Sequence, residues 1–201
     1  MESNKNRKKL LSVINLTKAA MFIALMAISA NLFSIIMIGP VPLTFQTLIA
    51  ILAGVLLGMK LGTFAMVGYA IVGLLGAPIF ANLQGGLAVA TRPTFGFILS
   101  FIFIAFIVGY IIEKSKKRST LTYFIACFAG LFINYGIGIP YLYLYSQYIL
   151  ELSDLTLLAT IIGNLPFFIK DVIFTAAAAS ICPRLVAAVE HSKTNQLQRP
   201  A

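Results

Sequence analysis

The chain repeatedly runs for about 20 residues with almost no charged side chain, which is the length that an α-helix needs to cross a lipid bilayer. Hydrophobic residues make up 60% of its 201 residues and charged residues only 10%. Soluble domains contain about 25% charged residues, so the composition excludes an ordinary soluble fold. The sequence therefore predicts an all-α, polytopic membrane protein with one compact domain.

Six transmembrane helices are predicted within a single membrane domain, 15–189, between a basic tail, 1–14, and a polar tail, 190–201. Their approximate ranges are 16–38, 44–58, 61–77, 93–112, 120–143 and 166–188. The first apolar run is too long for a cleaved signal peptide and leads directly into Gly39-Pro40, so it is interpreted as a retained helix.

The formal net charge of +9 reflects orientation in the membrane rather than nucleic-acid binding. Basic residues gather before the first span, in the short loop from Lys114 to Arg118, and after the last span. Cytoplasmic loops of membrane proteins carry such an excess of Lys and Arg. The loop that holds Glu151 and Asp154 has no basic residue and is expected outside. Six spans with both termini in the cytoplasm satisfy every basic cluster.

Candidate metal ligands and catalytic groups are scarce. Cys127 and Cys182 stand singly in apolar segments, without metal-ligand spacing, and the only histidine, His191, lies in the polar tail. We therefore expect no metal site. An intramembrane enzyme stays as an alternative, with Asp171 as its only support.

Several polar features share the outer half of the predicted topology. Arg92 follows an apolar, non-helical loop, 78–92, that contains Gly85-Gly86, and Gln46 follows a proline-rich loop, 39–47. Lys170 and Asp171 occupy the first turns of the last span. Charges at membrane depth are costly and more often functional than incidental. They predict one solute pocket that opens to the outside. The alternatives are an interfacial loop whose arginine reaches the lipid headgroups, or an Arg92–Asp171 ion pair that only joins two helices.

The tyrosines near the outer end of the fifth span are interpreted mainly as an interfacial belt, from which one or two side chains contact a ligand. These tyrosines are Tyr135, Tyr141, Tyr143, Tyr145 and Tyr148.

Four runs of residues resemble the BioY family, the biotin-specific substrate-capture subunits of energy-coupling-factor (ECF) transporters. They are Gly39-Pro-Val-Pro-Leu-Thr-Phe-Gln-Thr-Leu48, Gly73-Leu-Leu-Gly-Ala-Pro-Ile-Phe-Ala81, Gly85-Gly86 and Arg92-Pro-Thr-Phe-Gly-Phe97. The resemblance implies a six-helix subunit of the bacterial cell membrane that takes up biotin and has no enzymatic activity and no cofactor. A capture subunit for a different vitamin is the alternative.

The resemblance also implies partners, namely a membrane-embedded coupling subunit and two ABC ATPase subunits. Ala20 and Ala24 match the Ala-x-x-x-Ala motif through which such subunits contact the coupling subunit. The chain has no Gly-x4-Gly-Lys-Ser/Thr phosphate loop, so the energy for uptake is expected from the ATPases.

Biotin has a ureido head, an apolar ring and chain, and a carboxylate, and the resemblance implies a residue for each. Asp171 and Asn82 are expected at the ureido group, and Gln46 or Tyr141 assists. Arg92 suits the carboxylate, with Lys170 as the second candidate.

Gly86 permits close approach of the backbone to the ligand, and Phe45, Phe80 and Phe95 are candidate walls. The family often carries Pro-Gly-Asp-x-x-Lys at the start of the last span. Here Lys170 replaces its glycine and Phe174 replaces its lysine.

Overall fold

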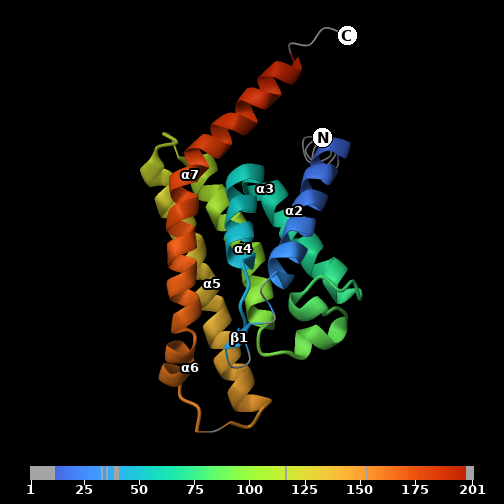
Figure 1. The fold of residues 1–201 in the computed structure, drawn as a ribbon, viewed down its shortest axis with the longest axis vertical. Coiled ribbons are helices and arrows are strands. Elements are labelled where there is room, and N and C mark those ends of the chain that lie inside the picture. Colours follow the sequence, from blue (N-terminus) through green and yellow to red (C-terminus); the bar gives the residue numbers. More distant parts are fainter. Residues whose placement is uncertain are drawn as a thin grey trace, which may run out of the picture.

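The computed structural model is a bundle of long helices (Figure 1) and describes residues 12–32, 34, 36–38, 41–115, 117–152 and 154–197, without the side chains of 38 and 190–197. Its α-helices are α2 (Val13–Asn31), α3 (Gln46–Leu74), α4 (Phe95–Lys114), α5 (Thr120–Tyr148), α6 (Leu157–Gly163) and α7 (Leu165–Leu197). Among the described residues, five helices are long and apolar enough to cross a membrane. The prediction of an all-α membrane protein is confirmed.

Side chains at the helix starts explain where several helices begin. Ser12 accepts a hydrogen bond from the backbone N–H of Asn15 at the start of α2 (3.4 Å), and Ser119 accepts one from Thr122 at the start of α5 (3.3 Å). Thr156 does the same for Ala159 in α6 (3.2 Å). Such N-caps satisfy N–H groups that have no partner within the helix.

Helix α3 folds back on itself at Gly58, whose φ of 78° is left-handed backbone that glycine adopts without strain. A Cβ atom added to Gly62 would lie 2.8 Å from the carbonyl oxygen of Ala53, so the two halves pack against each other. Glu113 of α4 accepts a hydrogen bond from the N–H of Met59 (2.8 Å) and so caps the second half. The chain reversal expected between the spans 44–58 and 61–77 is thus found at Gly58, and α3 supplies two helical segments (Figure 1).

Several predicted boundaries were wrong. The first helix ends at Asn31 rather than at 38, because the chain then forms a short antiparallel hairpin of β1 (Met37–Ile38) and β2 (Val41–Pro42). Gly39 and Pro40 lie outside the described residues. Pro93 precedes α4 instead of opening it. These differences are local, because hairpin pairing and cap geometry depend on contacts between segments.

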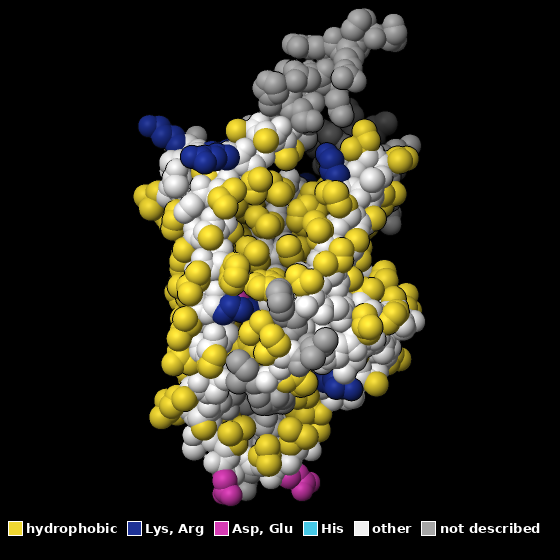
Figure 2. Space-filling view, in the orientation of Figure 1, with side chains coloured by type: hydrophobic (Ala, Val, Ile, Leu, Met, Phe, Trp, Pro, Cys, Tyr) yellow, Lys and Arg dark blue, Asp and Glu magenta, His cyan; other side chains and the backbone are white. Residues whose placement is uncertain are grey.

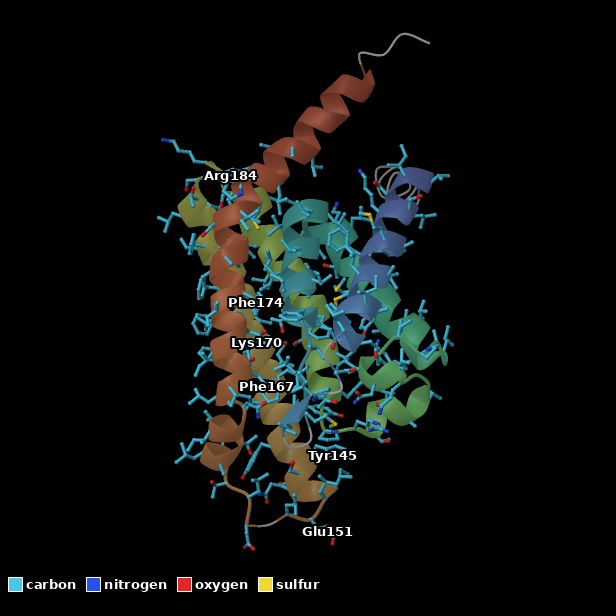
Figure 3. All side chains as sticks on the ribbon, viewed as in Figure 1. Tyr145, Glu151, Phe167, Lys170, Phe174 and Arg184 are labelled. Atoms are coloured by element: carbon cyan, nitrogen blue, oxygen red, sulfur yellow. The ribbon has the colours of Figure 1, made fainter. Side chains whose placement is uncertain are left out.

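The outer ends of the last two long helices also differ from the prediction. Helix α5 continues through Pro140 to Tyr148, although Pro140 removes one backbone hydrogen bond. The short helix α6 was not predicted, and α7 extends to Leu197, with a change of direction near Arg184 in Figure 3. The two tails predicted at 1–14 and 190–201 fall largely outside the described side chains.

Charged side chains gather at the two ends of the molecule. Figure 2 shows Lys and Arg side chains at the end where α2 begins and at places between the two ends, whereas Asp and Glu side chains show at the opposite end. Figure 3 places Arg184 toward the first end and Glu151 at the second. Between them the outer faces of the helices are apolar, with exposed Leu121, Phe132 and Ile173. This distribution is typical of a protein surrounded by lipid.

The loop between α3 and α4 contains two short 3-10 helices, η1 (Ala81–Leu83) and η2 (Leu87–Thr91). The segment 78–92, predicted as non-helical, thus has no α-helix but is partly 3-10 helical. It lies near the hairpin and the start of α4, at the same end as Glu151, and there it closes one side of a cavity.

Candidate functional site

A cavity lies between the hairpin, the first half of α3, the η1–η2 loop, and helices α4, α5 and α7. The empty space among its lining residues, with the open solvent at its mouth included, is about 860 Å³. Its polar lining residues are Thr44, Gln46, Thr47, Asn82, Gln84, Arg92, Thr94, Asn134, Tyr135, Asn164, Lys170 and Asp171. Its apolar walls include Phe80, Phe97, Phe101 and Phe167.

Asp171 is the centre of a buried hydrogen-bond network. Its Oδ2 accepts hydrogen bonds from the hydroxyl groups of Tyr135 (2.8 Å) and Thr47 (3.2 Å). Its Oδ1 lies 2.9 Å from the Nζ of Lys170. The side chain is 7% exposed, so the paired cation and the two donors offset the cost of burying a carboxylate. The Arg92–Asp171 pair considered from the sequence is not formed, because Lys170 holds that carboxylate.

Lys170 is held on three sides. Besides its ion pair, its Nζ donates a hydrogen bond to the carbonyl oxygen of Thr44 and lies 5.2 Å from the centroid of the Phe45 ring. Phe174 packs edge-on against Phe45, with 4.8 Å between ring centroids. Figure 3 shows Phe167, Lys170 and Phe174 along α7. Phe174, at the family's lysine position, therefore builds the aromatic support under Lys170.

A second set of bonds connects this network to α4 and α5. Asn134 donates from Nδ2 to the hydroxyl of Thr47 (3.1 Å), and Ser100 donates to Oδ1 of Asn134 (2.7 Å). Both Asn134 and Ser100 are fully buried. The chain from Ser100 to Asp171 thus crosses four helices and fixes the polar wall of the cavity.

Gln46 is fixed in the cavity by the second half of α3. Its Nε2 donates to the hydroxyl of Tyr69 (2.8 Å), which in turn donates to the carbonyl oxygen of Ile79 (3.0 Å). Phe80 packs edge-on against Tyr69, with 5.3 Å between ring centroids. The loop after Pro78 is therefore anchored to the bundle and presents Phe80 as a wall of the cavity.

The exposed side chains of Asn82 and Arg92 lie at the mouth of the cavity. Asn82 has φ 60° and ψ 34°, a left-handed conformation that asparagine tolerates better than most residues. The next residue, Leu83, is also left-handed, and its N–H donates to Oδ1 of Asn31 (2.7 Å) at the end of α2. Within the described part of the chain, Arg92 has no ion-pair partner.

Two of the predicted binding residues do not line the cavity. The hydroxyl of Tyr141 donates to the carbonyl oxygen of Ala90 (3.2 Å) and so holds the η2 turn instead. Gly86 has φ 90° and donates its N–H to the carbonyl oxygen of Gly73 (2.7 Å), which makes it part of a turn. The predicted wall residue Phe95 packs against Tyr141.

Ala20 and Ala24 are both exposed on α2. They lie on the side of α2 away from the buried residues Ala19, Phe22 and Met26. The small-residue stripe is thus open to a neighbouring helix within the membrane.

The cavity combines groups that suit a small amphipathic anion. The exposed guanidinium of Arg92 can bind a carboxylate through two parallel hydrogen bonds. Amide and carboxylate groups can donate and accept deeper inside, and the four phenylalanines supply apolar contact. Among the described residues, no cluster of His, Cys, Asp and Glu side chains could hold a metal ion.

Tyr135, Asn134 and Asn164 are among the cavity residues that were not assigned from the sequence. Tyr135 was grouped with the interfacial tyrosines, but it is 8% exposed and bonded to Asp171. An asparagine in the middle of an apolar span was the available signal for Asn134. Its partners, however, become visible only once the helices are packed.

The family model of the BioY family matches residues 3–191. A protein of Thermotoga maritima named "Biotin transporter BioY" is 38% identical over 170 residues, which are 85% of this chain and 94% of that protein. A "Probable biotin transporter BioY" of Pyrococcus horikoshii is 37% identical over 166 residues, or 83% of this chain and 92% of that one.

A crystal structure of the S-component for biotin from an ECF-type ABC transporter is also similar to the fold. The TM-score is 0.66 and the sequences are 29% identical, over 90% of this chain and 92% of the other. From the family model, the relatives and the fold together, this chain belongs to the BioY family.

Proposed function

We propose that this protein captures biotin outside the cell and delivers it, as the S-component of an ECF-type ABC transporter, across the bacterial cell membrane. The observation that carries the proposal is the cavity, which has a cation at its mouth and a buried carboxylate network inside. Biotin has complementary groups, because it ends in a carboxylate and carries two N–H donors on its ureido ring. The names of the relatives support the same ligand.

In this proposal Arg92 binds the carboxylate of biotin. Lys170 is already paired with Asp171 at 2.9 Å, and its charge is therefore largely used within the protein. Arg92 is exposed at the mouth, so a ligand carboxylate can neutralise it. Asp171, Asn82 and Gln46 are assigned to the ureido head, and the ion pair with Lys170 holds the Asp171 carboxylate in place.

The proposed topology has six spans, with the two segments of α3 counted separately, and both termini in the cytoplasm. The basic end of the molecule in Figure 2 then faces the cytoplasm, and the mouth of the cavity faces outward. This orientation presents the binding site to external biotin.

Uptake is proposed to require a membrane-embedded coupling subunit and two ABC ATPase subunits. The exposed stripe of Ala20 and Ala24 allows close approach of another membrane helix, so it is the proposed contact with the coupling subunit. The protein itself acts by binding and not by catalysis.

Uptake of labelled biotin tests this function. The assay uses biotin-auxotrophic bacterial cells without their own biotin transport, which produce the protein together with a coupling module. We expect uptake that unlabelled biotin abolishes and that thiamin and riboflavin leave unchanged, with chemically intact biotin recovered from the cells. Competition by another vitamin would support that vitamin as the ligand, and chemically altered biotin would favour an enzyme.

The variant Ala24→Leu examines the partner contact in the same cells. It should lower uptake at least tenfold and leave biotin binding by the purified protein unchanged, because a leucine there blocks close helix packing. Ala177→Leu, at an exposed alanine of α7, is the matched control and should retain uptake. Equal uptake by all three proteins would contradict the proposed contact.

A further inference from the structure

Asn164 is a buried residue that lines the cavity, and one of the two polar atoms of its side-chain amide has no hydrogen-bond partner. It lies at the junction of α6 and α7 and is 4% exposed. Its Nδ2 donates to the carbonyl oxygen of Thr160 (2.8 Å), and its backbone carbonyl accepts from Phe168 (3.1 Å). Its Oδ1, in contrast, is the one buried side-chain N or O atom of the described residues without a hydrogen-bond partner.

The orientation of this amide follows from its partners. Because Nδ2 must face the carbonyl oxygen of Thr160, the amide cannot be turned over without placing two acceptors against each other. Oδ1 therefore stays an acceptor without a donor, on a residue that lines the cavity. A buried acceptor without a donor is destabilising, and a ligand N–H would remove that cost.

Asn164 directly precedes α7, and its carbonyl accepts the N–H of Phe168 in the first turn of that helix. Asp171 stands seven positions after Asn164, about two helical turns and about 10 Å further along the axis, on the same side of the helix. Phe167, which also lines the cavity, is between them. Asp171 already receives three contacts from the protein, whereas Oδ1 of Asn164 receives none.

We propose that Asn164 is a ligand-binding residue whose Oδ1 accepts a hydrogen bond from an N–H group of the bound molecule. This inference rests on the proposed function, because in biotin the only N–H groups are the two of the ureido ring. One of them is assigned to Asn164 and the other to Asp171. The two donors point to opposite sides of the ring, so separate acceptors can meet them.

Two analogues of biotin test this assignment, each with one ring N–H replaced by an oxygen atom. Equilibrium binding to the purified protein is measured for biotin and both analogues. Wild type should bind the analogue that lacks the Asn164-facing donor about tenfold more weakly than biotin. In Asn164→Leu this ratio should fall to about one, because the acceptor is gone. The ratio does not depend on the folded fraction of a variant.

Asn164→Asp separates ligand binding from a purely structural role. Aspartate keeps the shape and the acceptor oxygens but loses the donor to Thr160. It should therefore keep the tenfold ratio, even where both ligands bind more weakly.

An Asn164→Leu variant with the wild-type ratio, or an Asn164→Asp variant that behaves like Asn164→Leu, would overturn the assignment alone. A wild-type protein that does not bind biotin would overturn the proposed function and this assignment together.

Discussion

The buried pair of Lys170 and Asp171 shows how single residues set the polarity of the cavity. Each charge is costly in an apolar bundle, and each is offset by the other together with Thr44, Thr47 and Tyr135. The pair therefore behaves as one unit, and removal of one member leaves a buried charge without a counterion.

Lys170→Met should lower the stability of the protein by about 3 kcal/mol, because it strands the Asp171 carboxylate. The double variant Lys170→Met, Asp171→Asn should recover part of this loss, since it removes both charges. Thermal unfolding in detergent measures the midpoints of wild type, the single variants and the double variant. Additive effects of the two substitutions would show that the pair does not act as a unit.

The charged residues of the cavity and the amides Gln46 and Asn82 could be found from the sequence, whereas the amides Asn134 and Asn164 could not. Arg92, Lys170 and Asp171 stand out in apolar segments because each is costly there. Asn134 and Asn164 do not stand out, because a single amide in a span has many structural uses. The direction in which each asparagine points and its hydrogen-bond partners depend on how the helices pack against each other. The residues next to it in the sequence do not determine this packing.

At the scale of elements, the end of α5 holds the loop that carries Arg92. The hydroxyl groups of Tyr141 and Tyr145 donate to the carbonyl oxygens of Ala90 (3.2 Å) and Thr91 (2.5 Å) in η2. These bonds fix the backbone immediately before Arg92. Tyr141 thus acts on the site through the loop rather than by contact with the ligand.

The double variant Tyr141→Phe, Tyr145→Phe should bind biotin about tenfold more weakly, because Arg92 loses its fixed position while the aromatic rings stay. Its unfolding midpoint should change little. Tyr148→Phe is the matched control at an exposed tyrosine of the same helix end. Unchanged affinity in the double variant would show that η2 keeps its place without these bonds.

Close packing at Gly73 is a second element-scale feature, because it seats Phe80 against α3. A Cβ atom added there would lie 2.2 Å from the Phe80 ring. Gly73→Ala should therefore destabilise the protein by about 1–3 kcal/mol and displace Phe80.

Gly136→Ala is the control, since no other atom lies within 4 Å of its added Cβ, and it should be neutral or stabilising. Thermal unfolding in detergent compares the two variants. Equal midpoints for both would contradict tight packing at Gly73.

The long helices could be predicted from the length of the apolar runs. The reversal within α3 could be predicted from its glycines. The hairpin at β1 and β2 and the short helix α6 were not, because both are brief and lie outside the regular spans. The fifth span was predicted at 120–143, through Pro140, and only the last residues of α5, up to Tyr148, escaped prediction.

At the scale of the whole molecule, the charge distribution and the position of the cavity mouth together indicate how the protein is oriented in the membrane. Basic side chains lie at one end, and the acidic loop lies at the other, on the side of the cavity mouth. The unequal distribution of basic and acidic residues between the two ends could be predicted from the sequence, because it depends only on which loops contain charged residues. The position of the cavity required the folded arrangement of six segments.

Cysteine labelling in intact cells tests which end of the protein faces the outside of the cell. Cys127 and Cys182 are buried, and both can be replaced by alanine to remove their background. A membrane-impermeant maleimide should then label Asp154→Cys in intact cells and Lys117→Cys only after permeabilisation, since both positions are exposed at opposite ends. The reverse pattern would invert the proposed topology.

The central claim is that the cavity between Arg92 and Asp171 binds biotin, and equilibrium binding of labelled biotin to the purified protein in detergent tests it most directly. We expect saturable one-to-one binding by wild type and at least tenfold weaker binding by Arg92→Ala and by Asp171→Asn, because each loses a charged contact. Absence of binding in folded wild type, or near-normal binding in both variants, would contradict the account.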